Sequence, residues 1–418
     1  MSEALDSSSR VNDSDLVAWP RVAAISAMVA FSLPTFITGI EVYANGSINY
    51  VLLSLVIASV LLTLIGGLMG VIGAKTRMSS YLLVKIAFGE KGAAAVNIAF
   101  AISLVGWFGV NIDLFANAVQ SLGKDLLNVT IPTMLIEVIA GLLMVTTTVF
   151  GFRAINILAS ILTPIIALVT FVLLFGSLDE YSVTDFLNED KASVLNLSQL
   201  VGAITGAIIV GAIILPDITR FCRHYSGGFY TAFCAFMLVQ LFVLVVAAFA
   251  SAAFNSTDIL ELMLKAGLGI TAFFIVIAGS WVLNSLNLYS AMLSVGATVP
   301  KASGKIPTLL VGLLGVVAAF FNILDAFITF LIVLVTLFIP VCGIIITDYF
   351  IVNKARYTFD ILESNKAISV PGCASWFIGA LYATLTELGA ISSISPVASI
   401  DAILLSAVFY IALSKWID

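Results

Sequence analysis

The sequence predicts an all-α integral membrane protein of twelve transmembrane helices, arranged as a five-plus-five inverted repeat in which helices 1 and 6 are broken. Three observations predict this fold class. Hydrophobic residues make up 61% of the 418 positions and charged residues only 10%, against roughly 45–50% and 25% in soluble domains. Apolar stretches follow one another with short connections. Two of them are interrupted in matching places, at residues 32–39 and 211–216.

The apolar stretches define the predicted helices. A transmembrane helix needs about 20 predominantly apolar residues, and twelve segments meet this criterion without leaving room for a soluble domain. They cover residues 19–44, 50–73, 92–122, 131–150, 154–176, 198–221, 227–254, 267–296, 306–324, 326–352, 372–390 and 398–417.

Basic residues determine the predicted orientation. With both termini in the cytoplasm, 15 of the 18 lysines and arginines fall in cytoplasmic segments, and only Lys124, Lys191 and Lys265 lie outside. This bias satisfies the positive-inside rule. We therefore expect a multi-pass protein of the bacterial inner (cytoplasmic) membrane. Residues 1–18 are polar and acidic, unlike a cleavable signal peptide, and are predicted to form a disordered cytoplasmic tail.

The two breaks lie in corresponding helices of two repeats. Residues 19–176 (helices 1–5) and 198–352 (helices 6–10) form the predicted repeats, and residues 372–417 form two peripheral helices. Because five is an odd number, helices 1 and 6 run in opposite directions. Paired broken helices in inverted repeats are typical of LeuT-type transporters, whose substrate binds near the middle of the membrane. The alternative is that Pro34 and Pro216 merely kink ordinary helices.

Few residues could support catalysis. The single histidine, His224, lies in a basic segment at a helix end, so no Ser/His/Asp triad or histidine-containing metal cluster can be built around it. No phosphate-binding loop is present. We expect neither an enzyme nor a metal site nor a cofactor, with Na⁺ or H⁺ as the coupling ion. The expected partners are a small-molecule substrate and the lipid bilayer, without nucleic acid, and the protein is expected to be a monomer.

Helix 3 carries an aromatic ring and an amide on one face. Trp107 and Asn111 are four residues apart, a spacing that makes them neighbours on a helix. Such a pair suits a planar, hydrogen-bonding ligand, although a tryptophan can also serve only for packing. Asp113 falls on a second stripe of the same helix. An intramembrane carboxylate suggests a proton or cation relay; the alternative is an aspartate that is neutral or hydrogen-bonded between helices.

Helix 8 carries a polar stripe. Ser280, Asn284 and Asn287 recur at i, i+4 and i+7 along a segment that is otherwise apolar. The stripe could face a substrate, or it could join helices through hydrogen bonds.

These residues together resemble the nucleobase:cation symporter-1 family, which is the purine/cytosine permease family, and especially its bacterial cytosine permease branch. Four segments carry the resemblance. They are residues 73–76 (GAKT), 105–109 (VGWFG), 217–221 (DITRF) and 339–349 (IPVCGIIITDY), the last followed by Arg356 and Tyr357.

The resemblance implies a LeuT-type fold and uptake of a planar base, such as cytosine, a purine or a related ring, by alternating access coupled to a cation gradient. It implies that Trp107 stacks on the base, that Asn111 is a polar ligand beside it and that Asn284 recognises the base. The other substrate-binding residues expected beside the breaks and on helix 8 are Ser32, Thr35, Ala207, Gly211 and Ser280. The family's second stacking aromatic belongs to helix 6, where residues 207–211 are aliphatic or glycine here.

The resemblance also locates a sodium site between helices 1 and 8. Its backbone ligands correspond to residues near Phe31, and its helix-8 groups align with Gly279, Val282 and Leu283. Sodium prefers oxygen ligands, and side-chain hydroxyls are absent from these helix-8 positions. We therefore expect coupling to protons rather than sodium, with Asp113 as the first carboxylate to test.

The sequence is also compatible with two other functions. A carrier of the same fold could move a different small metabolite, such as a vitamin precursor, and a receptor could bind a ligand without transporting it. A channel would need a continuous polar pore lining, and a membrane enzyme would need converging catalytic groups. The sequence provides neither.

Overall fold

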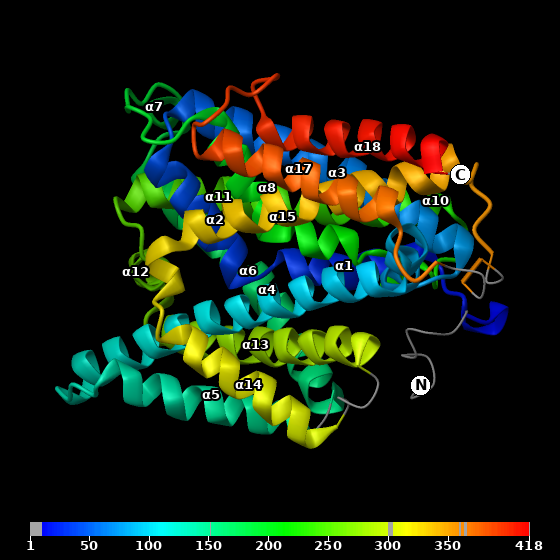
Figure 1. Cartoon of the computed structure of the whole chain (residues 1–418). Coiled ribbons are helices and arrows are strands. Elements are labelled where there is room, and N and C mark those ends of the chain that lie inside the picture. Colours follow the sequence, from blue (N-terminus) through cyan, green and yellow to red (C-terminus); the bar gives the residue numbers. More distant parts are fainter. Residues whose placement is uncertain (1–10, 151, 300–303, 359–360, 363–365, 418) are drawn as a thin grey trace.

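The computed structural model describes residues 11–417 except 151, 300–303, 359–360 and 363–365. Over these residues the chain is helical and forms no β-strand; one isolated bridge pairs Val17 with Cys222. Figure 1 shows most of the helices running along one direction, with the end of α18 (Ala398–Ile417) and residues 11–15 at one end of the bundle and α7 (Val183–Leu187) and α12 (Ile259–Met263) at the other.

The first predicted helix is two helices, α1 (Trp19–Ala30) and α2 (Leu33–Asn45). Only Phe31 and Ser32 separate them, so the interruption is shorter than the predicted 32–39. Pro34 is the second residue of α2 and does not break it, because a proline in the first helical turn gives up no intrahelical hydrogen bond. Gly39 serves close packing: a Cβ atom there would lie 2.7 Å from the backbone oxygen of Leu244.

The rest of residues 19–176, the predicted first repeat, consists of α3 (Ile48–Thr76), α4 (Ser80–Leu127), α5 (Thr133–Phe150) and α6 (Phe152–Glu180). Helix α4 is much longer than the predicted 92–122. Gly89, at φ 75°, bends it, a conformation that glycine adopts without steric cost. Residues 80–88 are therefore a separate arm at the start of the long helix.

The second interruption follows α8 (Leu197–Ile213). Ile214 and Leu215 separate α8 from the one-turn helix α9 (Pro216–Thr219), so this interruption is also shorter than the predicted 211–216. Helix α9 begins at Pro216, which is compatible with a first helical turn. The chain continues through α10 (Ser226–Ala232), the π-helical segment η2 (Phe233–Gln240) and α11 (Leu241–Phe254).

The last third of the chain contains the remaining long helices. They are α13 (Ile270–Thr298), α14 (Lys305–Ala319), α15 (Phe327–Thr347), α17 (Val370–Glu387) and α18. Short segments join them: η3 (Leu264–Leu268) precedes α13, η5 (Ile323–Ala326) precedes α15, and η6 (Asp348–Val352) follows it.

Eight helices of the described chain are long and apolar enough to cross a membrane, and α5 and α14 are shorter apolar helices. The interrupted pair α1 and α2, together with α17, occupies the other two predicted segments. The protein is thus a multi-pass membrane protein, and the short helices α7 and α12 lie in loops that the apolar pattern left without structure.

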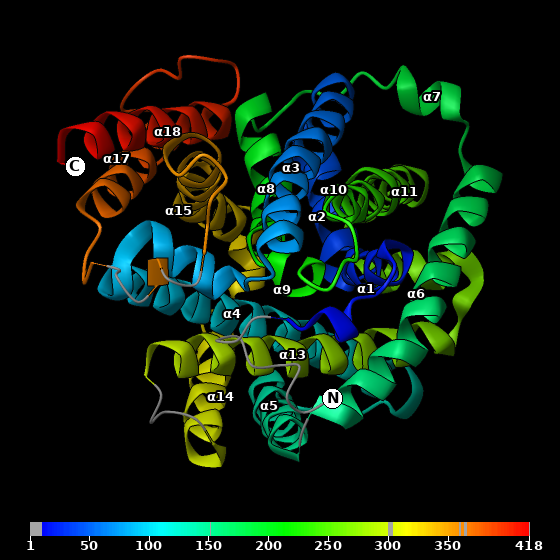
Figure 2. The same ribbon diagram turned by 90° about the vertical axis from the view of Figure 1, so that its right-hand side faces the viewer.

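The helices form two groups. Figures 1 and 2 show α4, α13, α14 and α5 together on one side and α1, α2, α3, α8, α10 and α11 on the other. Helices α17 and α18 pack on α15, where Gly343 allows close approach: a Cβ atom there would lie 2.7 Å from the backbone oxygen of Ile403. The two final helices are therefore closely attached to the rest.

The inner part of the predicted tail is ordered. The backbone N–H of Val17 donates to the carbonyl oxygen of Phe221 at 2.9 Å, and Arg223 N–H donates back to the Val17 oxygen at 2.9 Å. Residues 13–15 form a 3₁₀ turn. The disordered tail predicted for residues 1–18 is therefore wrong over residues 11–18, because this backbone pairs with the segment after α9. Residues 1–10 lie outside the described residues.

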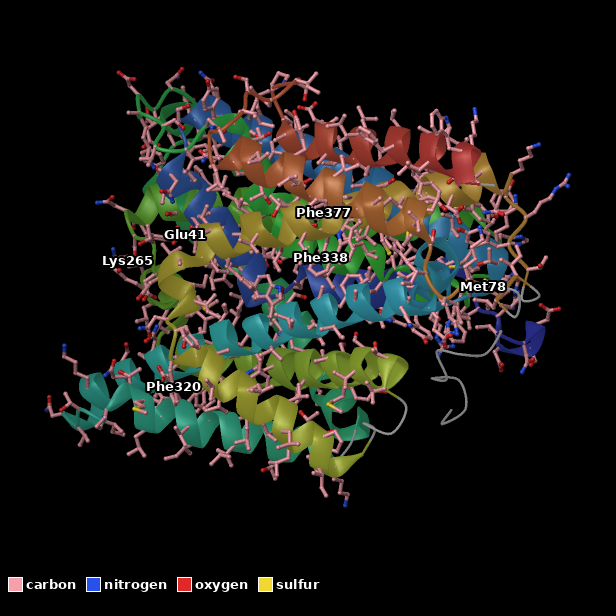
Figure 3. All side chains as sticks on the ribbon, in the orientation of Figure 1. Glu41, Met78, Lys265, Phe320, Phe338 and Phe377 are labelled. Atoms are coloured by element: carbon pink, nitrogen blue, oxygen red, sulfur yellow. The ribbon has the colours of Figure 1, made fainter. Side chains whose placement is uncertain are left out.

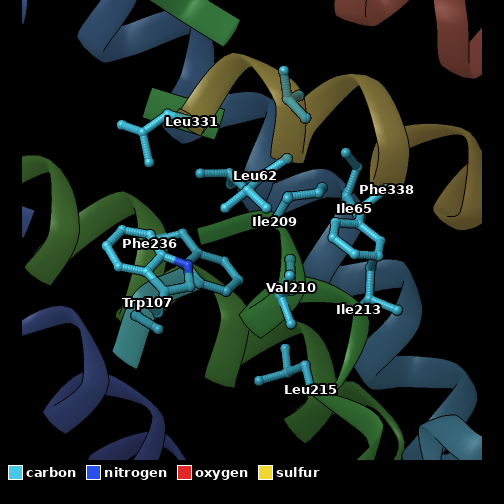
Figure 4. Close-up of a cluster of buried hydrophobic side chains, with 14 of the residues drawn as sticks. Leu62, Ile65, Trp107, Ile209, Val210, Ile213, Leu215, Phe236, Leu331 and Phe338 are labelled. Atoms are coloured by element: carbon cyan, nitrogen blue, oxygen red, sulfur yellow. The ribbon is translucent and has the colours of Figure 1, made fainter. Parts of the chain in front are cut away.

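A large apolar core runs through the bundle. Phe338 of α15, labelled in Figure 3, stacks on Phe100 of α4 with ring centroids 4.8 Å apart. The same core includes Trp107, Val210 and Phe236 (Figure 4). Burial of such side chains stabilises the packing of α4 against its neighbours.

Candidate binding site

Trp107 is held rigidly on α4. Its side chain is 8% exposed, and two phenylalanines of α15 pack against it edge to face: Phe330 with centroids 5.3 Å apart and Phe327 at 5.9 Å. Edge-to-face pairs of this kind contribute about 0.5–1.5 kcal/mol each beyond their buried area. The indole ring is thus fixed by α15 before any ligand binds.

Asn111 lies one turn further along α4. Its side chain is fully buried, and its Nδ2 donates a hydrogen bond of 2.7 Å to the carbonyl oxygen of Trp107. Its Oδ1 is also buried and has no hydrogen-bond partner. A buried acceptor without a donor is costly, so Asn111 presents an acceptor that a ligand N–H could satisfy.

The polar stripe predicted for helix 8 lies on α13, and some of its hydrogen-bonding groups are engaged within the protein. Asn284 Nδ2 donates to the backbone oxygen of Phe108 at 3.0 Å and lies 3.1 Å from Met144 Sδ. These contacts join α13 to α4 and α5. Asn284 Oδ1 and Ser280 Oγ are buried and have no partner. The donors of Asn284 are therefore engaged within the helix group that contains α4, α5 and α13.

The first interruption meets α13. Ser32 Oγ and Thr35 Oγ1 are 3.2 Å apart, and a Cβ atom on Gly279 would lie 3.1 Å from Leu33 Cδ1. Phe31 is half-buried beside this contact. Gly279, one of the residues predicted for sodium, thus packs against the start of α2. Separately, the described chain contains no group of three or more His, Cys, Asp or Glu residues suited to a metal.

The corresponding part of α8 is aliphatic. Ala207 and Gly211 are half-buried, and the atom nearest to a Cβ built on Gly211 is Ile208 Cγ2, 3.8 Å away. Gly206, by contrast, lies against α15: a Cβ atom there would come 1.9 Å from the backbone oxygen of Leu331. One side of α8 is therefore packed, while Gly211 has space beside it.

Asp113 does not share the surroundings of Trp107. Its side chain is 6% exposed, and the charges that act on it are those of Glu137 in α5 and Asp325 in η5. The structure therefore separates an aromatic region, with Trp107 and Asn111, from an acidic region on another face of α4.

Sequence reasoning missed several residues of this region. The aromatic support of Trp107 comes from Phe327 and Phe330, whose i, i+3 spacing places them on one face of α15. That spacing was a usable signal. Thr205 of α8, whose buried Oγ1 has no partner, and Met144 of α5 gave no signal, because isolated threonines and methionines are common in apolar helices.

Two of the segments that carry the family resemblance, residues 73–76 and 217–221, meet at the end of the bundle opposite α7. A Cβ atom on Gly73 of α3 would lie 2.6 Å from Pro216 Cα of α9. Arg77, the residue after α3, donates to the backbone oxygen of Arg220 at 3.0 Å and also to that of Cys222. On the arm of α4, Ser80 donates from its backbone N–H to Asp217 Oδ1 at 2.7 Å. The residues after the second interruption are thus fixed to α3 and α4.

Residues 22–405 match the family described as permease for cytosine/purines, uracil, thiamine, allantoin. The chain is 29% identical over 309 residues to the cytosine permease of Escherichia coli strain K12, which covers 73% of this chain and 71% of the relative. The cytosine permease of Escherichia coli O157:H7 gives the same values.

Two solved structures share the fold. The inward-facing conformation of Mhp1 superposes with a TM-score of 0.82 at 16% identity, covering 98% of this chain and 94% of that chain. Mhp1, a nucleobase-cation-symport-1 family transporter, in a closed conformation with bromovinylhydantoin bound gives 0.77 at 16% identity, covering 98% and 95%. At this identity the likeness shows a common fold.

Proposed function

The chain belongs to the family of permeases for cytosine and purines, uracil, thiamine and allantoin, and from this premise we propose that it imports a planar nitrogenous heterocycle across the cytoplasmic membrane. The nucleobase:cation symporter-1 resemblance of its motifs agrees with this family. The transporter works by alternating access, and a cation gradient drives uptake.

The observation that carries this proposal is the pairing of Trp107 with Asn111. Phe327 and Phe330 hold the indole ring from α15, and Asn111 Oδ1 is buried one turn away without a donor. A nucleobase has a flat face for stacking and N–H groups for the acceptor. Ser280 Oγ and Asn284 Oδ1 supply two further unpartnered oxygens for polar ring edges.

The interruptions of α1/α2 and α8/α9 supply the remaining contacts. Backbone groups at an interruption lack their usual helical partners and can bind a polar ligand or an ion. In this proposal Ser32 and Thr35 line the site from the first interruption, and Ala207 and Gly211 line it from the helix before the second. Residues 19–176 and 198–352 act as inverted repeats, with residues 372–417 outside them.

The membrane arrangement follows from the charge distribution. In the proposed arrangement all twelve predicted segments cross the inner membrane of a bacterium and both termini lie in the cytoplasm, because basic residues concentrate on that side. The protein acts as a monomer.

The proposed coupling ion is the proton. Val282 and Leu283 stand where a sodium site near Phe31 and Gly279 would gain side-chain hydroxyls, and hard cations require oxygen ligands. Asp113 offers a titratable group within α4. Uptake should therefore follow a proton gradient in the absence of sodium.

A second substrate class is favoured by α8. The aliphatic residues 207–210 provide no second aromatic face, so a ring could be held by one tryptophan alone. Such a site admits non-nucleobase heterocycles, and the family description includes thiamine and allantoin. The alternative is therefore a carrier of a vitamin or ureide of this kind.

Ligand binding to purified protein tests the assignment. A panel of nucleobases, thiamine and allantoin is titrated by isothermal calorimetry, and the best ligand is repeated with Trp107→Ala. Because Trp107→Ala removes one aromatic ring that stacks on the ligand, we expect the binding free energy to weaken by about 1–3 kcal/mol, which is roughly 5- to 150-fold in affinity. Trp416→Ala is the control, since Trp416 is 91% exposed at the end of α18. Equal affinity in the two variants would refute the assigned site.

A further inference from the structure

Asp113 is a buried carboxylate inside the helix bundle. Its side chain is 6% exposed, and no side chain donates a hydrogen bond to either carboxylate oxygen. The backbone N–H of Leu324 in η5 acts on it as a donor. Transfer of an ionised carboxylate into such surroundings is costly unless donors or a counter-charge compensate it.

The groups that face Asp113 make its charge still less favourable. Glu137 is 5% exposed and lies on the stretch of α5 that faces Asp113: Gln120 of α4 donates to Thr133 Oγ1 at 3.1 Å, and a Cβ atom on Gly141 would lie 3.1 Å from Ile112 Cδ1. Asp325 lies on η5 next to Leu324, and the charges of both acids act on Asp113. Helix α14 contacts this side of α4 through Ala318 and Ala319, which pack on Gly109. The titratable neighbours in the described chain are therefore both acids, and like charges at one site cannot all be ionised without cost.

A proton satisfies this arrangement better than a divalent metal ion. Calcium takes six or more oxygen ligands and magnesium demands octahedral coordination, whereas the described residues hold no group of three or more His, Cys, Asp or Glu suited to a metal. Protonation forms one O–H bond on a carboxylate oxygen, removes its charge and needs no further ligand. On release, the proton returns to water and the carboxylate regains its negative charge.

We propose that Asp113 and Glu137 form a proton-binding carboxyl pair between α4 and α5, spatially distinct from the ring-binding residues Trp107 and Asn111. This proposal rests on the proposed function, because it assigns the coupling proton a binding site. Asp325 is exposed on η5, and Asn117 is exposed one turn beyond Asp113 on α4. These polar residues provide a route for protons between the pair and the surface.

The segment η5 connects the pair to the aromatic region. Asp325 belongs to η5, and Phe327 begins α15 two residues later. Phe327 and Phe330 are the rings that contact Trp107. When Asp113 loses its proton, its negative charge repels Asp325 in η5. Because η5 directly precedes Phe327, this repulsion is transmitted to the two phenylalanines that pack against Trp107. Ring affinity should therefore depend on the protonation of Asp113.

Infrared spectroscopy of the purified protein tests proton binding without transport. At neutral pH the unliganded protein should show the carbonyl band of protonated carboxylic acids, and Asp113→Asn should remove part of that band. Asp185→Asn, on the exposed helix α7, should leave it unchanged. A wild-type spectrum without the band would overturn the proposal, as would a band of equal intensity in Asp113→Asn and Asp185→Asn.

Transport with the same variants tests coupling. In proteoliposomes, Asp113→Asn and Glu137→Gln should lose accumulation driven by a pH gradient by about 5- to 150-fold, the usual range for coupling between two sites. Exchange of labelled for unlabelled ring, which needs no net proton movement, should persist. Gradient-driven accumulation at the wild-type level in both variants would overturn the proposal that Asp113 and Glu137 bind the coupling proton. If wild-type protein moves no ring at all, the proposed function fails, while the infrared result still decides whether the proton site exists.

Discussion

The side-chain amide of Asn284 in α13 donates a 3.0 Å hydrogen bond to the backbone oxygen of Phe108 in α4. The bond is buried and crosses between two long helices, with Met144 Sδ of α5 as a second neighbour of the same nitrogen. Because the donor faces an oxygen, the orientation of the amide follows from its surroundings. Asn284 therefore stabilises one helix group and leaves only Oδ1 for a ligand.

Replacement of Asn284 should reduce stability as well as ligand affinity. Asn284→Ala removes the hydrogen bond and should lower the free energy of unfolding by about 1–3 kcal/mol. Denaturant or thermal unfolding in detergent measures the change. Asn287→Ala, at a half-buried position of the same stripe, is the control and should have a smaller effect. Equal loss of stability in the two variants would contradict the bracing role of Asn284.

Removal of the aromatic support should weaken ring binding indirectly. Phe330→Ala deletes an edge-to-face contact with Trp107 but leaves the indole in place, and such contacts contribute about 0.5–1.5 kcal/mol. The ring affinity should fall roughly 2- to 10-fold in calorimetric titrations. Phe377→Ala, at a position that is 67% exposed on α17, is the matched control. Wild-type affinity in Phe330→Ala would show that α15 does not position Trp107.

Two glycines of α8 should respond differently to alanine. At Gly206 the added methyl group would lie 1.9 Å from the Leu331 backbone oxygen, whereas at Gly211 its nearest neighbour is 3.8 Å away. Gly206→Ala should therefore cost about 1–3 kcal/mol of stability through overpacking. Gly211→Ala should fold normally and, if this position lines the site, change the selectivity among rings. Unfolding curves and competition binding measure the two effects, and a stable Gly206→Ala would disprove the tight α8–α15 contact.

Arg77 should be needed for the segment after the second interruption. Its guanidinium donates to the backbone oxygens of Arg220 and Cys222, which a lysine cannot imitate because it lacks the planar fork of donors. Arg77→Lys should increase proteolytic cleavage or hydrogen exchange over residues 217–224, while Lys75→Arg should not. Unchanged protection in Arg77→Lys would show that other contacts hold this segment.

Much of the fold could be predicted from the lengths of the apolar segments alone. The predicted segments fall on observed helices, and both interruptions occur where proline follows a short polar or aliphatic turn. Their extent was overestimated at Pro34 because proline in a first helical turn is compatible with the helix. The start of α4 and its bend at Gly89 were not predicted, because these residues fall between the predicted segments 50–73 and 92–122, where Lys85, Glu90 and Lys91 interrupt the apolar pattern.

The candidate site was only partly predictable. The i, i+4 spacing predicts Trp107 and Asn111 as neighbours, because helix geometry fixes which residues share a face, and in the structure the Asn111 amide donates to the Trp107 backbone oxygen. The neighbours of Asn284 and Asp113 depend on which helices lie opposite them. Helix packing is a tertiary property that local periodicity does not specify, so the contact of Asn284 with Met144 and the acidic surroundings of Asp113 became evident only in the folded protein.

Uptake of labelled heterocycles into proteoliposomes tests the central claim most directly. With purified protein as the only transporter, sodium absent and an inwardly directed proton gradient imposed, we expect accumulation of a planar nitrogenous ring and its loss in Trp107→Ala but not in Trp416→Ala. The contradictory result is that no nucleobase, thiamine or allantoin accumulates, or that accumulation follows a sodium gradient and ignores the proton gradient.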